Sequence, residues 1–255
     1  MKALILAAGY ATRLYPLTKQ FPKPLLKVEK RPIIDYILDK LQGLSDIDEI
    51  MVVTNSKFIS PFRQWAKTKK TQRRIEIIDD LTRNHTDRRG AIGDMLFVLQ
   101  QKRLQDDLLI IGGDNLFDSD LNDFISFAKK NRPHPVIGVY DINDLVHTSK
   151  YGIVKLDAKK RIVDFKEKPK VAKSTLVAMC LYYFPKERLG LIKEYLNLKT
   201  GKHDASGLYI DWLRKKVTVY GFLFQGRWYD IGDHHFYHSV KENFTKKQEG
   251  CNGNA

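Results

Sequence analysis

Apolar residues follow two alternating patterns along this chain, short continuous runs and longer runs with helical spacing. Residues 2–8 form a nearly continuous apolar run, which is typical of a strand covered on both faces. From Pro32 the apolar residues recur at helical intervals until Gly43, which suits the end of a helix. Further runs predict strands at residues 49–54, 74–78, 108–111 and 136–140, and helices at residues 58–70, 91–103 and 119–130, the last capped by Ser119 or Asp120.

The second half of the chain has a hairpin-like pattern. Residues 151–169 predict two strands around a turn at residues 157–160, followed by a strand at 176–184, helices at 186–196 and 206–215, and a strand at 217–224. A last helix is expected from about His234, with Asp233 as its cap. The predicted fold class is therefore α/β, a Rossmann-like, doubly wound and mostly parallel mixed sheet with a small antiparallel insertion.

Composition narrows the class of protein. The 255 residues show no linker-like segment, so we expect one domain over residues 1–246 and a disordered tail at 247–255. The net charge of +14 favours anionic partners such as phosphorylated metabolites or nucleic acid. The two cysteines, Cys180 and Cys251, form no disulfide framework, and no segment is apolar enough for a membrane span. The opening residues are expected to form a buried strand and not a secretory leader, and the protein is expected to be cytoplasmic.

The loop after the first strand carries the most specific pattern, LAAGYATRLYPLTKQFPKPLL at residues 6–26. A loop that leaves the carboxyl end of a parallel strand lies where open α/β sheets bind ligands. Gly9 allows the backbone to approach a ligand closely, and consecutive amides there can bind an anion. Arg13 and Lys23 add a planar guanidinium and a compact ammonium group, both suited to phosphate oxygens. Solvent-exposed cations beside an ordinary turn are the alternative interpretation.

This pattern resembles the signature of the sugar-phosphate nucleotidylyltransferases, the family that includes glucose-1-phosphate thymidylyltransferase and uridylyltransferase. The matching residues are Gly9, Thr12, Arg13, Leu14, Pro16, Thr18, Pro22 and Lys23. Ala11 stands where that family usually has a second glycine, which raises the question of whether position 11 adopts a positive φ. The resemblance implies catalytic roles for Arg13 and Lys23, and nucleotide binding by Leu6, Ala8, Gly9, Tyr10, Ala11, Thr12, Gly90 and Ala91.

Two acidic motifs resemble the metal ligands of the same family. Asp114 ends the segment IIGGD after a predicted strand, and Asp230 lies in RWYDIGD near the other end of the chain. The motif alone leaves open that Asp114 only caps a turn. The resemblance implies that Asp114 and Asp230 bind Mg²⁺, a cofactor that suits carboxylate oxygens and bridges phosphates.

The resemblance also implies an acceptor site at Tyr151, Gly152, Glu167 and Lys168, where the glutamate binds sugar hydroxyls and the lysine binds the acceptor phosphate. The strand at residues 176–184 lacks the glycine that the family often has near Met179 and Cys180, so the identity of the acceptor is the least secure implication. Arg83, Arg88 and Arg89 belong either to a solvated loop or to an additional phosphate clamp.

The predicted activity is transfer of a nucleotidyl group from an NTP to a phosphorylated small-molecule acceptor, with a hexose 1-phosphate as the first candidate, and release of pyrophosphate. A cytidylyltransferase acting on a phospho-alcohol or phosphonate such as phosphocholine is the alternative, and a nucleotide-sugar-dependent glycosyltransferase is a more distant one.

The basic residues are dispersed and form no RNA-binding motif, so nucleic acid is not an expected partner, and neither is a membrane. GYATRL does not supply the G-x-G-x-x-G of dinucleotide oxidoreductases. Acetyltransferase activity is not expected, because no hexapeptide repeats are present; a homo-oligomer is left open.

Overall fold

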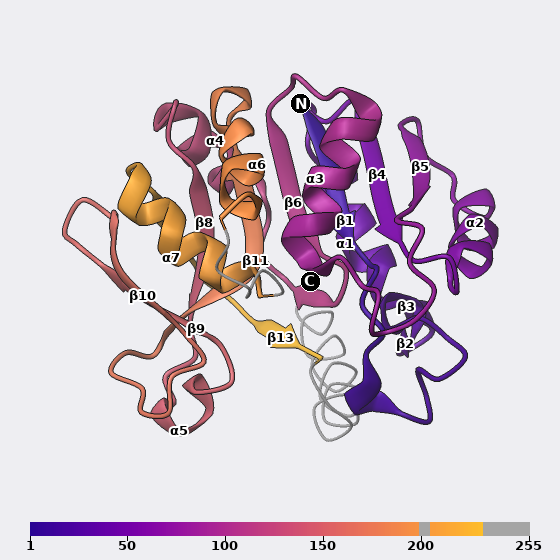
Figure 1. Ribbon diagram of the computed structural model, residues 1–255, viewed down its shortest axis with the longest axis horizontal. Coiled ribbons are helices and arrows are strands. Elements are labelled where there is room, and N and C mark those ends of the chain that lie inside the picture. The colour runs from indigo at the N-terminus through magenta and orange to yellow at the C-terminus, as the bar shows by residue number, and fades with distance from the viewer. Residues whose placement is uncertain (199–204, 232–255) are drawn as a thin grey trace, which may run out of the picture.

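A mixed β-sheet forms the centre of the computed structural model, which describes residues 1–198 and 205–231 (Figure 1). The described strands of this sheet are β1 (Lys2–Leu6), β4 (Glu49–Thr54), β5 (Arg74–Asp79), β6 (Leu108–Gly112), β8 (Val136–Asp141), β9 (Gly152–Leu156), β10 (Ile162–Glu167), β11 (Leu176–Phe184) and β12 (Tyr220–Phe224). Their order is β10-β9-β11-β6-β1-β4-β5, and β8 pairs with both β11 and β12.

The strands β6, β1, β4 and β5 form the parallel half of the sheet. Leu4 of β1 lies opposite Met51 of β4 on one side and Ile110 of β6 on the other. β11 joins antiparallel to β6, and β9 and β10 form the antiparallel hairpin around residues 157–160. The predicted fold class, a mostly parallel mixed sheet with an antiparallel insertion, is confirmed.

Helices cover both faces of the sheet. The described helices are α1 (Ile33–Gln42), α2 (Ile59–Lys67), α3 (Gly90–Lys102), α4 (Asn122–Lys130), α5 (Leu145–Thr148), α6 (Gly190–Leu196) and α7 (Ser206–Lys216). Successive side chains of a strand point to opposite faces, so Ile5 packs in the core under α1, α2 and α4 while Leu4 packs under α3, α6 and α7. Figure 1 shows α3 and α6 in front of the sheet and α1 behind it. Burial on both faces explains why these strands are apolar at nearly every position.

Short elements surround the carboxyl ends of the parallel strands. They are β2 (Lys27–Val28), β3 (Arg31–Pro32), β7 (Asn115–Phe117), β13 (Trp228–Asp230) and the 3-10 turns η1 (Thr12–Leu14) and η2 (Lys23–Leu25), whereas the 3-10 turn η3 (Lys186–Arg188) follows β11 at the other end of the strands. β7 and β13 form a separate antiparallel pair, which brings the segment after β6 beside a segment more than 100 residues later. The periodicity of the sequence did not predict β2, β3, β7, β13 or α5.

Several predicted boundaries differ from the structure. The predicted cap of α4 by Ser119 or Asp120 is wrong, because the helix begins at Asn122 with Leu121 before it and no side-chain cap. The helix predicted at residues 58–70 spans Ile59–Lys67, and the strand predicted at 217–224 begins at Tyr220. The predicted helix from His234, its cap Asp233 and the tail at 247–255 lie outside the described residues.

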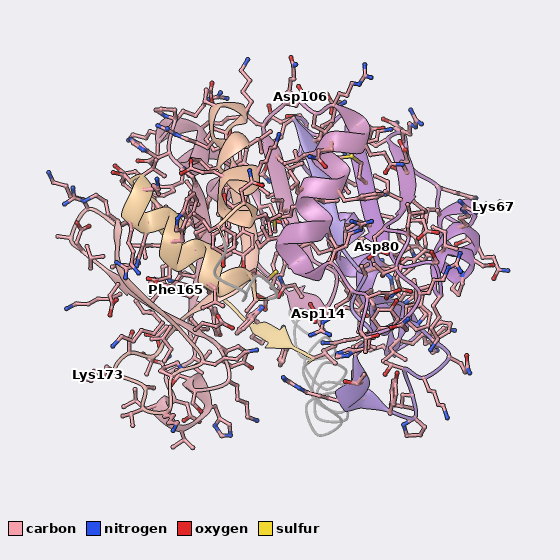
Figure 2. All side chains as sticks on the ribbon, viewed as in Figure 1. Lys67, Asp80, Asp106, Asp114, Phe165 and Lys173 are labelled. Carbon is pink, nitrogen blue, oxygen red and sulfur yellow. The ribbon has the colours of Figure 1, made fainter. Side chains whose placement is uncertain are left out.

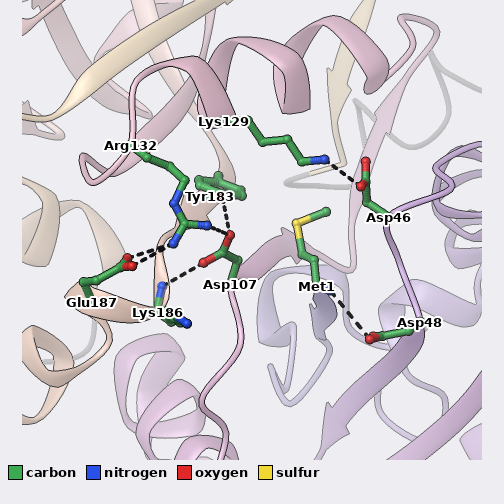
Figure 3. A network of polar contacts seen from close by, with 9 residues as sticks. All are labelled: Met1, Asp46, Asp48, Asp107, Lys129, Arg132, Tyr183, Lys186 and Glu187. Carbon is green, nitrogen blue, oxygen red and sulfur yellow. Dashed lines mark hydrogen bonds and ion pairs between the residues drawn. The ribbon is translucent and has the colours of Figure 1, made fainter.

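A network of polar contacts surrounds the amino end of the central strand β6 (Figure 3). The Asp107 carboxylate accepts hydrogen bonds from the Tyr183 hydroxyl at 2.5 Å and from the backbone amide of Lys186 at 3.0 Å. Arg132 joins Asp107 to Glu187. These contacts attach the loop before β6 to β11 and η3, at the opposite end of the strands from the loop that carries Arg13.

Within residues 1–198 and 205–231, no helix combines the length and the apolar composition needed to cross a membrane.

Candidate active site

A cavity of about 420 Å³ lies at the carboxyl ends of the parallel strands. Eleven of the residues implicated by the sequence line it, eight from the opening of the chain and three from later segments: Leu6, Ala8, Gly9, Tyr10, Ala11, Thr12, Arg13, Lys23, Gly90, Ala91 and Asp114. The structure therefore brings the predicted nucleotide-binding and cationic residues together around a single volume. Their functional roles stay predictions.

The opening loop is held in shape by hydrogen bonds to its own carbonyls. Ala11 has φ 46° and ψ 45°, the left-handed conformation that a second glycine would adopt most readily. The Thr18 hydroxyl donates to the Ala11 carbonyl at 2.7 Å, and the Asn55 amide donates to the Ala8 carbonyl at 2.8 Å. These bonds leave Arg13 exposed at the cavity.

Lys23 and Asp114 form an ion pair inside the cavity, with 2.6 Å between the lysine Nζ and the carboxylate Oδ2. The Lys23 side chain is only 11% exposed, whereas that of Asp114 is 37% exposed and accessible to a ligand. Gly113 allows this approach, since a Cβ there would lie 2.9 Å from the Leu6 carbonyl oxygen and 3.0 Å from Pro24 Cγ. The close packing of β6 against the opening loop thus places a cation beside the carboxylate.

The β7–β13 pair places the backbone of Asp230 directly opposite Asn115, the residue after Asp114. Asn115 is fixed on both sides, because its amide donates to the Met179 carbonyl at 2.6 Å and its carbonyl oxygen accepts from Trp228 Nε1 at 3.0 Å. The side chain of Asp230 lies outside the described part of the structure. The register nevertheless brings the two predicted metal-binding positions, far apart in sequence, near each other, with Asp230 in β13 and Asp114 directly before β7.

The donor chemistry at Asp114 fits a divalent cation. Among the described side chains, no three of His, Cys, Asp or Glu gather in an arrangement that could hold a metal ion. Asp114 offers hard carboxylate oxygens at a cavity, and Mg²⁺ characteristically uses one or two carboxylates together with water and phosphate oxygens. A Mg²⁺ site formed by the Asp114 carboxylate together with phosphate oxygens of a substrate agrees with this ligand preference.

The four predicted acceptor residues lie together on the β9–β10 hairpin, outside the lining of the 420 Å³ cavity as far as residues 1–198 and 205–231 show it. Gly152 pairs with Glu167 across the hairpin, and the Lys168 amide donates to the Tyr151 carbonyl at 3.0 Å. Lys168 Nζ lies 3.7 Å from Glu167 Oε1. Burial raises the pKa of Glu167, opposed by the charge of Lys168.

The helix α7 packs directly on this group. A Cβ at Gly207 would lie 1.8 Å from Glu167 Oε2, so only glycine lets the first turn of α7 approach the carboxylate. β11 connects the hairpin to the cavity, because Val177 pairs with Ile153 of β9 while Cys180 lines the cavity. Cys180 has φ 51° at an irregularity in the pairing of β11. This residue therefore has a left-handed backbone conformation although it is not a glycine.

Sequence reasoning missed three polar residues that line the cavity, namely Asp80, His85 and Asp94. No sequence pattern marked Asp80 and Asp94, because only the fold places the end of β5 and the first turns of α3 at this cavity. Of the three loop arginines, Arg88 lines the cavity and donates to the His85 carbonyl at 2.6 Å. Arg89 instead donates to the Asp80 carbonyl at 2.7 Å, and Arg83 is exposed with its backbone amide bonded to Asp87.

The fold and the site define an α/β protein with a cationic loop and an acidic strand end facing one cavity. The chain belongs to the nucleotidyl transferase family, whose model matches residues 2–247. The family resemblance seen in the sequence is thereby confirmed.

Curated relatives agree with this family. The chain is 29% identical over 233 residues to the bifunctional protein GlmU of Methanococcus aeolicus, covering 91% of this chain and 51% of that protein. It is 29% identical over 239 residues to a putative mannose-1-phosphate guanyltransferase of Sulfolobus acidocaldarius, covering 91% and 60%. The chain thus spans about half to three fifths of the length of these relatives.

Solved structures share the fold. A UDP-glucose pyrophosphorylase complexed with UDP-glucose superposes with a TM-score of 0.80 at 21% identity, covering 96% of this chain and 98% of that one. A putative glucose-1-phosphate thymidylyltransferase from Bacillus anthracis gives a TM-score of 0.77 at 22% identity, covering 95% and 94%. At these identities the likeness concerns the fold.

Proposed function

We propose that the protein is a nucleotidylyltransferase that joins an NTP to a phosphorylated acceptor, for which a hexose 1-phosphate is the first candidate. The observation that carries this proposal is the Lys23–Asp114 ion pair beside the Arg13 loop, in a cavity at the carboxyl ends of parallel strands. Relatives at 29% identity, among them a putative mannose-1-phosphate guanyltransferase, support the same reaction class.

The chemistry needs positioning and charge neutralisation more than a protein nucleophile. An oxygen of the acceptor phosphate attacks the α-phosphorus in line, a new P–O bond forms, and the bond to the β-phosphate oxygen breaks to release pyrophosphate. Two anionic reactants repel each other until cations lie between them. Arg13 stabilises the leaving phosphates, Lys23 the α-phosphate, and Lys168 the acceptor phosphate.

Asp114, with Asp230 in the paired strand, is the proposed ligand set for Mg²⁺, which neutralises phosphate charge when bound. Lys23 Nζ lies 2.6 Å from Asp114 Oδ2, so the lysine is held beside the carboxylate and next to the cavity. Glu167 is the proposed acceptor of hydrogen bonds from sugar hydroxyls, and its position on the hairpin is fixed by Gly152 and Gly207.

A second acceptor class, a phospho-alcohol such as phosphocholine, is favoured by one observation. The ring of Trp228 lies 5.4 Å from that of Tyr151 and 5.6 Å from that of Tyr140, measured between centroids. Clusters of aromatic rings bind quaternary ammonium groups through cation–π attraction. This cluster stands next to the proposed acceptor residues, since Tyr151 accepts the hydrogen bond from Lys168.

The test is a matrix of nucleoside triphosphates against hexose 1-phosphates and phosphocholine with Mg²⁺, read as pyrophosphate release. Asp114→Asn should lower turnover about a hundredfold, equivalent to roughly 3 kcal/mol of transition-state stabilisation, while circular dichroism stays unchanged. Asp106→Asn, an exposed acid at the other end of β6, is the matched control and should leave turnover intact. Near-normal turnover in Asp114→Asn would rule out its metal-binding role. Release of a nucleoside diphosphate from a nucleotide sugar would indicate a glycosyltransferase instead.

A further inference from the structure

Two buried acidic side chains, Asp80 and Asp94, line the cavity on the side away from Asp114. Asp80 follows β5, and Asp94 lies one turn into α3, on the same helix as Gly90 and Ala91. Asp80 is 1% exposed and Asp94 is 6% exposed, yet both reach the cavity wall. A carboxylate at this depth requires hydrogen-bond partners, because burial of a charged group is otherwise very unfavourable.

The two acids form a hydrogen-bonded pair. The Asp80 carboxylate also accepts hydrogen bonds from the Thr82 amide at 2.7 Å and from the Thr82 hydroxyl at 2.8 Å. Burial raises the pKa of Asp80. The Tyr10 hydroxyl lies 3.3 Å from that of Thr82, which connects the pair to the opening loop.

The sheet order fixes how far this acidic wall is from the proposed phosphate region. Asp80 stands at the end of β5 and Asp114 at the end of β6, with β1 and β4 between them. Three strand spacings amount to about 14 Å. Figure 2 shows the two labelled carboxylates separated in this way, Asp80 on the β5 side of α3 and Asp114 below β6. Phosphates held at Arg13 and Lys23 therefore leave the base on the Asp80 side.

An acidic wall discriminates among bases by their hydrogen-bonding edges. Cytosine, adenine and guanine each present an exocyclic amino group, which donates to a carboxylate. Uracil and thymine present carbonyl oxygens on both sides of one N–H, and those oxygens would face the oxygens of the acid pair. A carbonyl oxygen of the base placed against a carboxylate oxygen leaves both oxygens without a hydrogen-bond donor. Binding is weakened, because each oxygen loses the hydrogen bonds that it made with water.

We propose that the Asp80–Asp94 pair reads the base of the nucleotide and selects an amino-bearing one, so that CTP, ATP or GTP is the substrate and UTP and dTTP are rejected. This inference rests on the proposed nucleotidylyltransferase function and specifies its nucleotide. Asp94 is the specificity-determining residue of the pair, and Asp80 positions it through the network with Thr82.

Isothermal titration calorimetry of ATP, GTP, CTP, UTP and dTTP with Mg²⁺ and no acceptor tests the proposal. At least one amino-bearing nucleotide should bind roughly tenfold or more tightly than both UTP and dTTP. In Asp94→Ala that preference should fall to within about threefold, with the purified variant checked by circular dichroism. Asp94→Asn, which keeps the size of the side chain and adds an amide donor, should improve UTP binding relative to CTP. Asp106→Ala, exposed at the opposite end of the sheet, should keep the wild-type preference.

The possible results separate the base assignment, the role of the acid pair and the proposed function. Tight binding of UTP or dTTP to the wild-type protein would overturn the base assignment while the proposed function stands. A preference for amino-bearing bases that survives in both Asp94 variants would show that the pair is only structural. Failure of all five nucleotides to bind would overturn the proposed function, and this inference with it.

Discussion

Ala11 is the residue at which the opening loop departs most from ordinary backbone geometry. Its φ of 46° belongs to the left-handed region, where an L-residue with a Cβ is less stable than glycine by about 1 kcal/mol. The Thr18 hydroxyl bonded to its carbonyl holds the conformation. Ala11 thus adopts, without being glycine, the backbone conformation that glycine adopts most readily.

Substitutions at position 11 should separate the effect of the side chain from that of the backbone. Ala11→Val places a β-branched residue in the left-handed region and should destabilise the protein by about 2 kcal/mol and weaken nucleotide binding. Ala11→Gly should be close to neutral, because relief of strain is offset by greater freedom in the unfolded chain. Thermal denaturation and calorimetry measure both effects. A Val variant as stable as the wild type would contradict the left-handed assignment.

Glu167 provides a second prediction, on the dependence of stability on pH. Burial raises its pKa in the folded state, so the folded protein retains a proton that the unfolded chain releases above the ordinary value of 4.5. The free energy of unfolding therefore decreases as the pH rises from the ordinary pKa of the unfolded chain through the raised pKa of the folded protein. Glu167→Gln removes this loss, and its melting temperature relative to the wild type should increase between about pH 4 and pH 7. Glu194→Gln, at an exposed position, should show no such increase.

At the scale of elements, the closest approach is that of α7 to the end of β10. Gly207 lies in the first turn of α7, and Glu167 is the last residue of β10. The absence of a side chain at position 207 allows the helix to contact the carboxylate directly. The helix thereby fixes a proposed substrate-binding group without a hydrogen bond of its own.

Gly207→Ala should act on the acceptor and not on the nucleotide. The added Cβ must displace Glu167, at an overpacking cost of about 1–3 kcal/mol, and the KM for the acceptor should rise while the dissociation constant of the nucleotide is unchanged. Gly190→Ala is the matched control, because a Cβ at that position of α6 meets no atom within 4 Å. Equal acceptor kinetics in the two variants would disprove a positioning role for Gly207.

The long elements were predictable from sequence because burial on two faces gives them uninterrupted apolar or helical patterns. β4 and β11 have the predicted bounds. β7 and β13 were not predictable, since three residues give too few positions for a period and their pairing spans a large sequence separation. The loop residues with a phosphate-binding pattern were predicted, whereas Asp80 and Asp94 were missed because only the fold places the end of β5 beside α3.

At the scale of the whole molecule, the net charge of +14 bears on how substrates arrive. A cationic surface raises the local concentration of polyanions, and salt screens the attraction over about 10 Å at 0.1 M. This long-range effect would add to the proposed phosphate contacts of Arg13 and Lys23 and is independent of the base.

The apparent affinity for every nucleotide should therefore fall with ionic strength. Between roughly 20 mM and 300 mM KCl we expect the KM for any accepted triphosphate to rise several-fold, with little change in kcat. A titration with KCl at fixed Mg²⁺ measures this, and the nucleoside alone, which carries no phosphate charge, is the control ligand for binding. Nanomolar binding of random RNA in physiological salt would instead favour a nucleic-acid partner.

β13 is the last described strand in chain order, yet it pairs with β7 directly after Asp114. During synthesis the ribosome releases Trp228 long after Asn115, so a growing chain exposes its opening loop while the neighbour of Asn115 is still untranslated. Stalled or truncated translation products that end before residue 228 should accordingly lack turnover even where they fold. The connectivity of the molecule would in this way prevent unfinished copies from consuming cellular nucleotide.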